Sequence, residues 1–183
     1  ASDYPQKVAT ALQNVWKEFS GIAVLNMVDN TYPVYLENMD QAYYGYVQPV
    51  NPIGDNPNTS VKETRSSYSY MALRNSYPSS VYGDPTKALE VTIAHEFFHS
   101  VQTSRNAFEK PWLFEGQATA METVIYPKYN DNHQYLGFWT QFPEVSLYYT
   151  SDFSGKDAWE GHEYGIWPIF YRGQDKYGWD FQK

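Results

Sequence analysis

The sequence of 183 residues contains no cysteine and only four histidines. Without thiols the chain cannot form a disulfide, use a thiolate nucleophile or hold a metal ion through sulfur. Any metal site must therefore be built from histidine and carboxylate side chains. Because histidines are so few, the position of each one is informative.

Basic residues are also scarce, since 13 Lys and Arg stand against 21 Asp and Glu and the net charge is −8. Nucleic acids and anionic lipid surfaces attract basic patches, so we expect neither as a partner. No apolar run approaches the roughly 20 residues that span a bilayer, and the first residues lack the basic and then apolar pattern of a signal peptide. The many Tyr, Asn and Ser residues favour an extracellular or periplasmic protein, and no pattern indicates its oligomeric state.

The first half of the chain carries one helical pattern followed by several strand patterns. Apolar residues at helical spacing predict an amphipathic helix over residues 5–19. Alternating apolar and aromatic residues predict strands near 32–36, 44–47 and 66–73. The turn-forming run at 51–58 predicts a loop and is the best linker candidate.

The second half is mainly helical. Asp84 followed by Pro85 predicts a helix start, because Asp accepts the free N–H groups of the first turn and Pro fits the first helical position. Further helices are expected from Trp112 to about Tyr126 and from about 161 to 177, the last with a kink at Pro168.

These patterns together predict an α+β fold in one catalytic domain, residues 1–183. A sheet-bearing lobe, residues 1–83, is expected to precede a mainly helical lobe, residues 84–183.

The first of these later helices contains the pattern H-E-x-x-H from His95 to His99. Residues four apart share one face of a helix, so the two imidazoles can reach one zinc ion at bond lengths of about 2.0–2.1 Å. Glu96 lies beside that point but off the ligand axis, as a general base requires. The structural alternative is a pair of surface histidines beside an unrelated glutamate.

A catalytic zinc ion needs a third protein ligand and an open position. Glu115 at the start of the next helix is the predicted third ligand, with Gly116 and Ala118 small enough for a neighbouring helix to approach. Glu122 is the rival ligand, and Glu115 could instead stabilise the helix dipole. Thr119 and Glu122 follow one and two turns along, placed as second-layer partners that accept N–H bonds from the zinc histidines.

The two patterns together, H-E-x-x-H at 95–99 and W-x-x-E-G-x-A at 112–118, resemble the gluzincin zinc metallopeptidases. This superfamily contains thermolysin, and the resemblance is to its branch with the E-G-x-A helix, over roughly Thr86 to Tyr177. It implies a zincin-like α+β fold, in which an N-terminal mixed sheet with helices precedes a helical lobe and the zinc site lies in the cleft between them.

The resemblance also implies a role for each matching residue. His95, His99 and Glu115 correspond to the ligands of one catalytic Zn²⁺ ion, and Glu96 corresponds to the catalytic base. A later segment, residues 163–167, resembles the element that presents a transition-state-stabilising tyrosine. This implies Tyr164 in that role, with His162 as a second candidate and simple packing as the alternative for Tyr164.

Three features bear on the kind of peptidase. Only 15 residues separate His99 from Glu115, so the connection must be tight. No G-x-M-E-N element, which holds the substrate amine in aminopeptidases of this branch, precedes the zinc helix, and its absence favours an endopeptidase. The strand that ends in Met71-Ala72-Leu73 has the position in the chain of the sheet edge that binds extended substrates in this superfamily.

The sequence therefore predicts a zinc-dependent metallopeptidase that hydrolyses peptide bonds in a peptide or protein substrate. The alternative is a catalytically inactive, zinc-stabilised module that binds peptides or proteins without cutting them. Hydrolysis of a non-peptide amide or ester is a third possibility, because the same activated water attacks other carbonyls.

Overall fold

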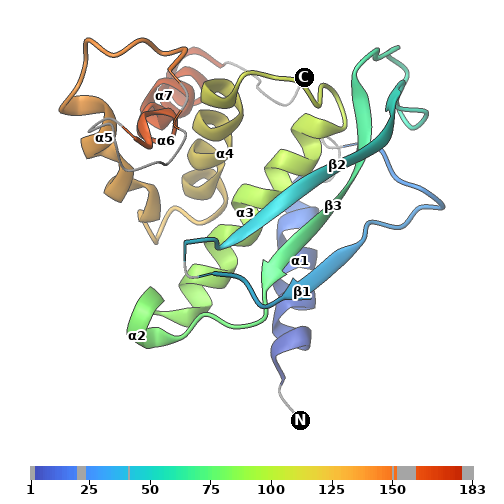
Figure 1. Ribbon diagram of the computed structural model, residues 1–183, viewed down its shortest axis with the longest axis horizontal. Coiled ribbons are helices and arrows are strands. Elements are labelled where there is room, and N and C mark those ends of the chain that lie inside the picture. Colours follow the sequence, from blue (N-terminus) through green and yellow to red (C-terminus); the bar gives the residue numbers. More distant parts are fainter. Residues whose placement is uncertain (1–2, 20–23, 41, 150, 152–159, 179–183) are drawn as a thin grey trace. The chain divides into compact units, whose positions relative to one another are not determined.

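The computed structural model describes residues 3–19, 24–40, 42–149, 151 and 160–178 (Figure 1). The chain divides into two compact units, Ala1–Phe108 and Glu109–Lys183. The expected lobes divide instead at residue 83. The difference arises from the long helix that follows this residue, which packs against the sheet and so belongs to the first unit.

The first unit is an α+β structure with a mixed sheet, as predicted. Its three strands have the order β1-β3-β2, with β1 parallel and β2 antiparallel to β3. Its elements are, in chain order, α1 (Tyr4–Phe19), β1 (Val34–Glu37), β2 (Gly45–Gly54), β3 (Ser66–Arg74), α2 (Ser79–Tyr82) and α3 (Pro85–Thr103).

The position of β3 corrects one prediction. This strand, which ends in Met71-Ala72-Leu73, pairs on both sides and is central, so the expectation that it forms a sheet edge is wrong. Among the described strands, β1 and β2 are the edges.

The strand β2 corrects another prediction, because it continues to Gly54 through part of the run expected to be a loop and linker. Its register shifts between Val50 and Ile53, which marks a bulge. Pro49 and Pro52 lack an N–H group, and an edge strand tolerates this because only one side is paired.

The helix α3 is held between neighbours on two sides. Asp84 caps its start by accepting the N–H groups of Thr86 and Lys87 at 2.8 and 3.3 Å, as predicted. α3 packs against β2, β3 and α1, and Phe19 of α1 stacks on Phe97 with ring centroids 5.5 Å apart. The apolar face of α1 therefore serves packing.

The second unit is helical in its described residues. It contains α4 (Pro111–Ile125), the 3₁₀ helix η1 (Asp131–Tyr135), α5 (Leu136–Thr140), α6 (His162–Gly165) and α7 (Trp167–Tyr177). The expected last helix is broken at Ile166, because Pro168 lies in the first turn of α7, where a missing N–H costs no hydrogen bond. The core of this unit is formed by Ala120, Ile166, Trp167 and Phe170.

A β-carbon added at Gly116 of α4 would lie 2.5 Å from Cε2 of Phe170 and 2.9 Å from Cγ1 of Ile166. The predicted close approach of a neighbouring helix at Gly116 is thus confirmed. None of the helices that the structure describes is both long and apolar enough to cross a membrane.

Candidate metal centre

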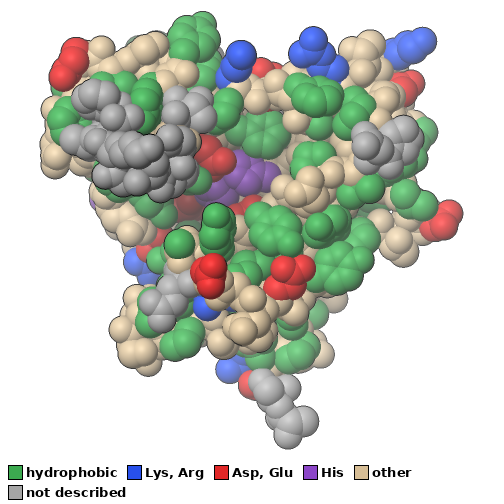
Figure 2. Space-filling model, in the orientation of Figure 1, with side chains coloured by type: hydrophobic (Ala, Val, Ile, Leu, Met, Phe, Trp, Pro, Cys, Tyr) green, Lys and Arg blue, Asp and Glu red, His purple; other side chains and the backbone are tan. Residues whose placement is uncertain are grey.

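His95 and His99 lie one turn apart on α3, and their rings approach closely. The ring centroids are 4.6 Å apart and the ring planes are nearly perpendicular, at 86°. His95 is half-buried and His99 is 8% exposed. Figure 2 shows histidine side chains on the face that it draws. The helical spacing brings the two imidazoles together as the sequence predicts.

The two residues inside the motif, Phe97 and Phe98, lie on the side of α3 that packs against α1. Their side chains are almost completely buried, and both rings contact Phe19 of α1 at centroid distances of 5.5 and 5.9 Å. Burial of two large aromatic side chains contributes roughly 1.5–3 kcal/mol each. This packing fixes the rotation of α3 about its axis and so fixes where the histidines point.

His99 has a hydrogen-bond partner that sequence analysis missed. Its Nδ1 atom lies 2.8 Å from Oε1 of Gln102. An amide oxygen accepts a hydrogen bond, so this contact suits the tautomer in which Nδ1 carries the proton and Nε2 keeps the lone pair that a metal ion needs. The signal was present in the sequence, because residues three apart on a helix are neighbours.

Glu96 is 7% exposed and lies in a polar part of the first unit. Burial raises the pKa of the Tyr32 and Tyr77 hydroxyls, and the negative charge of Glu96 adds to the rise. Both phenols therefore stay protonated at neutral pH. Tyr32 shares hydrogen bonds with Ser100 and, at 3.2 Å, with Ser69, while Ser100 donates to the Glu96 carbonyl oxygen.

Glu115 lies in the first turns of α4 and is half-buried. Among the described residues, one group of His, Asp and Glu side chains is close enough to hold a metal ion, and it consists of His95, His99 and Glu115. Each offers one ligand atom, and these atoms lie within 4.8 Å of one another. The rival ligand Glu122 is not a member of this group.

The chemistry of this donor set fits a zinc ion. Two imidazole nitrogens and one carboxylate oxygen form a common ligand set of catalytic zinc sites. Ligand atoms at the corners of a zinc tetrahedron with bonds of about 2.0–2.1 Å lie roughly 3.3 Å apart. The 4.8 Å limit of the group is wider than this separation.

The other predicted site residues all belong to the second unit. Thr119 and Glu122 are buried on α4, and the Thr119 hydroxyl has no hydrogen-bond partner in the described structure. Tyr164 of α6 is half-buried, with its ring 5.5 Å from the ring of Tyr135. The second-layer roles of Thr119 and Glu122 and the role of Tyr164 stay predictions.

His162 is completely buried, and neither ring nitrogen has a hydrogen-bond partner among the described residues. Burial lowers the pKa of this histidine, against the opposing effect of the neighbouring Glu163 carboxylate. Glu163 in turn accepts hydrogen bonds from the backbone N–H and hydroxyl of Ser151 at 3.0 and 2.7 Å. His162 is therefore neutral at pH 7 and closed off from solvent.

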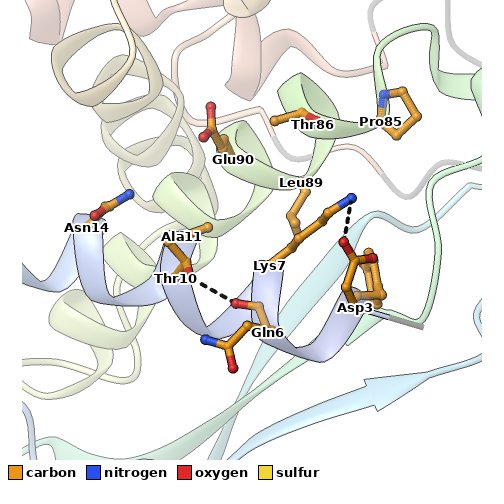
Figure 3. A pocket seen from close by; sticks show the side chains of 11 residues that line it. Asp3, Gln6, Lys7, Thr10, Ala11, Asn14, Pro85, Thr86, Leu89 and Glu90 are labelled. Atoms are coloured by element: carbon orange, nitrogen blue, oxygen red, sulfur yellow. Dashed lines mark hydrogen bonds and ion pairs between the residues drawn. The ribbon is translucent and has the colours of Figure 1, made fainter. Parts of the chain in front are cut away.

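A groove between α1 and the first turns of α3 contains none of the predicted site residues (Figure 3). Lys7 and Asp3 form an ion pair of 3.3 Å at one end of it, and Thr86 and Glu90 of α3 line the other side. Exposed ion pairs of this kind contribute little to stability. The groove has none of the metal-binding chemistry of the histidine pair.

Comparisons of the chain with models of known protein families, with curated proteins and with solved structures find no match.

Proposed function

We propose that the protein is a zinc-dependent metallopeptidase with a zincin-like fold, and that it cuts within peptide chains. The observation that carries this proposal is the grouping of the ligand atoms of His95, His99 and Glu115 within 4.8 Å of one another. Glu96, next to the first ligand and largely buried, supports hydrolysis over mere metal storage. An extracellular or periplasmic location remains part of the proposal.

His95, His99 and Glu115 would hold the ion, which when bound polarises the scissile carbonyl and acidifies the attacking water. The Glu96 carboxylate would accept the proton of that water at one oxygen and pass it to the leaving amine. Burial keeps the Tyr32 and Tyr77 phenols protonated, so neither competes with Glu96 for that proton.

The residue that stabilises the oxyanion would be Tyr164 or His162. Removal of one such donor typically lowers kcat by about 10²–10³. The half-buried phenol of Tyr164 favours it over His162, whose ring has no exposed surface. Comparing kcat of Tyr164→Phe with that of His162→Leu distinguishes the two.

An extended peptide is the substrate class that the sheet supports best. β2 is an edge strand in the described sheet, and an unpaired strand edge can bind an extended chain through main-chain hydrogen bonds. Its first residue, Gly45, lies against the side chain of Glu96. The start of β2, beside Glu96, is therefore the proposed substrate-binding edge in place of β3.

The proposal is tested by elemental analysis of the purified chain together with hydrolysis of casein. We expect one zinc ion per chain in the wild type and in Glu122→Ala, and a loss of zinc and turnover in Glu115→Ala. Wild-type protein that takes up no zinc on soaking would overturn the proposal. Retention of zinc in Glu115→Ala and its loss in Glu122→Ala would reassign the third ligand.

The rival function, a zinc-stabilised module that binds peptides without cutting them, makes a different prediction in the same experiment. It requires bound zinc without hydrolysis of casein or of any member of a peptide library. Peptide retention by the zinc-loaded protein, measured by isothermal titration, would then replace turnover as the activity.

A further inference from the structure

We infer that Gly45 is a positioning residue for Glu96, because the absence of a side chain at the start of β2 leaves the space in which the Glu96 side chain lies. This inference rests on the proposed role of Glu96 as the catalytic base. It concerns a residue of the sheet that touches Glu96 but carries no chemical group of its own.

A side chain at position 45 would meet close neighbours on three sides. A β-carbon built on Gly45 would lie 3.1 Å from Cγ of Glu96, 3.1 Å from Cγ2 of Thr92 and 3.0 Å from the carbonyl oxygen of Ala72. Such distances are tighter than nine in ten real contacts of this kind, so a neighbour must give way by a few tenths of an ångström. The backbone of Gly45 itself has no positive φ, so an alanine adds no backbone strain there.

Two of the three neighbours are held in place. The Ala72 carbonyl belongs to β3, the central strand, which is paired on both sides. Thr92 is buried on α3, and branching at its β-carbon restricts the rotamers that could move Cγ2 away from Gly45. Glu96, with three rotatable side-chain bonds, is the neighbour that yields.

Hydrogen bonds also hold the backbone before Gly45 in place. The Tyr77 hydroxyl donates to the Tyr44 carbonyl oxygen at 2.7 Å. The buried Arg74 guanidinium donates to the carbonyl oxygens of Asp40 and Tyr43, the latter at 2.9 Å. These hydrogen bonds fix the backbone that leads into β2.

A methyl group at position 45 would therefore push the Glu96 side chain rather than the strand or the helix. A general base must lie within hydrogen-bond reach of the proton that it accepts, and a misplacement of about 1 Å can lower a rate 10²-fold. For a shift of a few tenths of an ångström we expect Gly45→Ala to lower kcat about tenfold. Because the methyl acts on the base, KM should stay within about twofold.

The chain offers a matched control and a rescue. Gly54 ends the same strand, and a β-carbon there would meet nothing within 4 Å, so Gly54→Ala should keep the wild-type kcat. Thr92→Ser removes the Cγ2 atom but keeps the hydroxyl group. Added to Gly45→Ala, it opens space for the new methyl group and should restore much of the lost kcat.

The experiment measures kcat and KM of these variants on one fluorogenic peptide that spans a casein cleavage site. Crystal structures of the metal-free wild type and Gly45→Ala provide a second readout that needs no turnover, the displacement of the Glu96 side chain. The inference requires a lower kcat with an unchanged KM, rescue by Thr92→Ser and a displaced Glu96.

Four outcomes would overturn the inference. They are an unchanged kcat in Gly45→Ala, a raised KM with an unchanged kcat, an equal loss in Gly54→Ala, and a Gly45→Ala protein that fails to fold because the strand or helix moved instead. Wild-type protein that cleaves no peptide would instead reject the proposed function, and the crystal structures would still report whether the methyl displaces Glu96.

Discussion

The Nδ1 atom of His99 lies 2.8 Å from the Oε1 atom of Gln102, three residues further along the same helix. An imidazole that binds a metal through one nitrogen usually donates a hydrogen bond from the other, which fixes its tautomer and orientation. Gln102 supplies that acceptor from within α3.

Replacing Gln102 with leucine should weaken zinc binding without unfolding the protein. The change removes the acceptor of the Nδ1 proton, and loss of such partners typically costs about 10–100-fold in metal affinity. Gln102→Glu is the matched control, because a carboxylate accepts the same hydrogen bond. Competition with a chromophoric chelator measures both dissociation constants, and a leucine variant that binds zinc as tightly as the wild type would contradict this role.

Replacing Glu96 with glutamine should leave zinc in place and remove turnover. Glutamine has nearly the same shape but cannot accept a proton at pH 7, and general-base catalysis contributes about 10²–10⁴ in rate. Glu90→Gln on the same helix is the control, because Glu90 lines the groove of Figure 3 and should not affect the rate. Zinc content and kcat are measured together, and wild-type turnover in Glu96→Gln would refute the mechanism.

Local signals in the sequence predict the parts of the structure that depend on few neighbours. The capping of α3 by Asp84, the meeting of His95 and His99 on one helix face, and the break before Pro168 all follow from spacing within a single helix or turn. In each case the governing interaction spans at most four residues, so no knowledge of the tertiary fold is needed.

Long-range relationships could not be predicted in this way. That β3 is central depends on its pairing with two strands that precede it in the chain, and nothing in its own pattern of residues specifies which neighbours it takes. The contact of Gly45 with Glu96 joins a strand to a helix about fifty residues later. Neither residue carries a sequence signal for the other, because packing between elements decides the contact.

Gly116→Ala should destabilise the second unit. The added methyl would lie 2.5 Å from Cε2 of Phe170, and overpacking of this kind costs about 1–3 kcal/mol. Alanine gains up to about 1 kcal/mol over glycine in a helix, which offsets only part of the cost. Chemical denaturation measures the net loss, and a second change, Phe170→Leu, should recover part of it by removing the clashing ring. If Gly116→Ala alone were more stable than the wild type, α7 would have to move away from the added methyl group.

The burial of His162 predicts a loss of stability in mild acid. In the unfolded chain its pKa is about 6.5, while burial lowers the pKa in the folded protein. Below pH 6.5 the unfolded state therefore binds a proton more readily than the folded state does. This difference lowers the free energy of unfolding. The stabilisation is complete above pH 6.5 and decreases as the pH falls below it, by up to about 1.4 kcal/mol per pH unit until the folded pKa is reached.

His162→Leu should remove this pH dependence while keeping the fold at neutral pH. Leucine has a similar volume and lacks the two ring nitrogens that have no partner in the described structure, so the variant should be at least as stable as the wild type at pH 7.5. The free energy of unfolding of both proteins is measured with EDTA from pH 7.5 to 5.5. Because the wild type alone must protonate a buried imidazole, it should lose more stability than the variant between pH 6.5 and 5.5, by up to about 1 kcal/mol. Parallel curves would mean that the imidazole of His162 becomes charged without leaving its buried position.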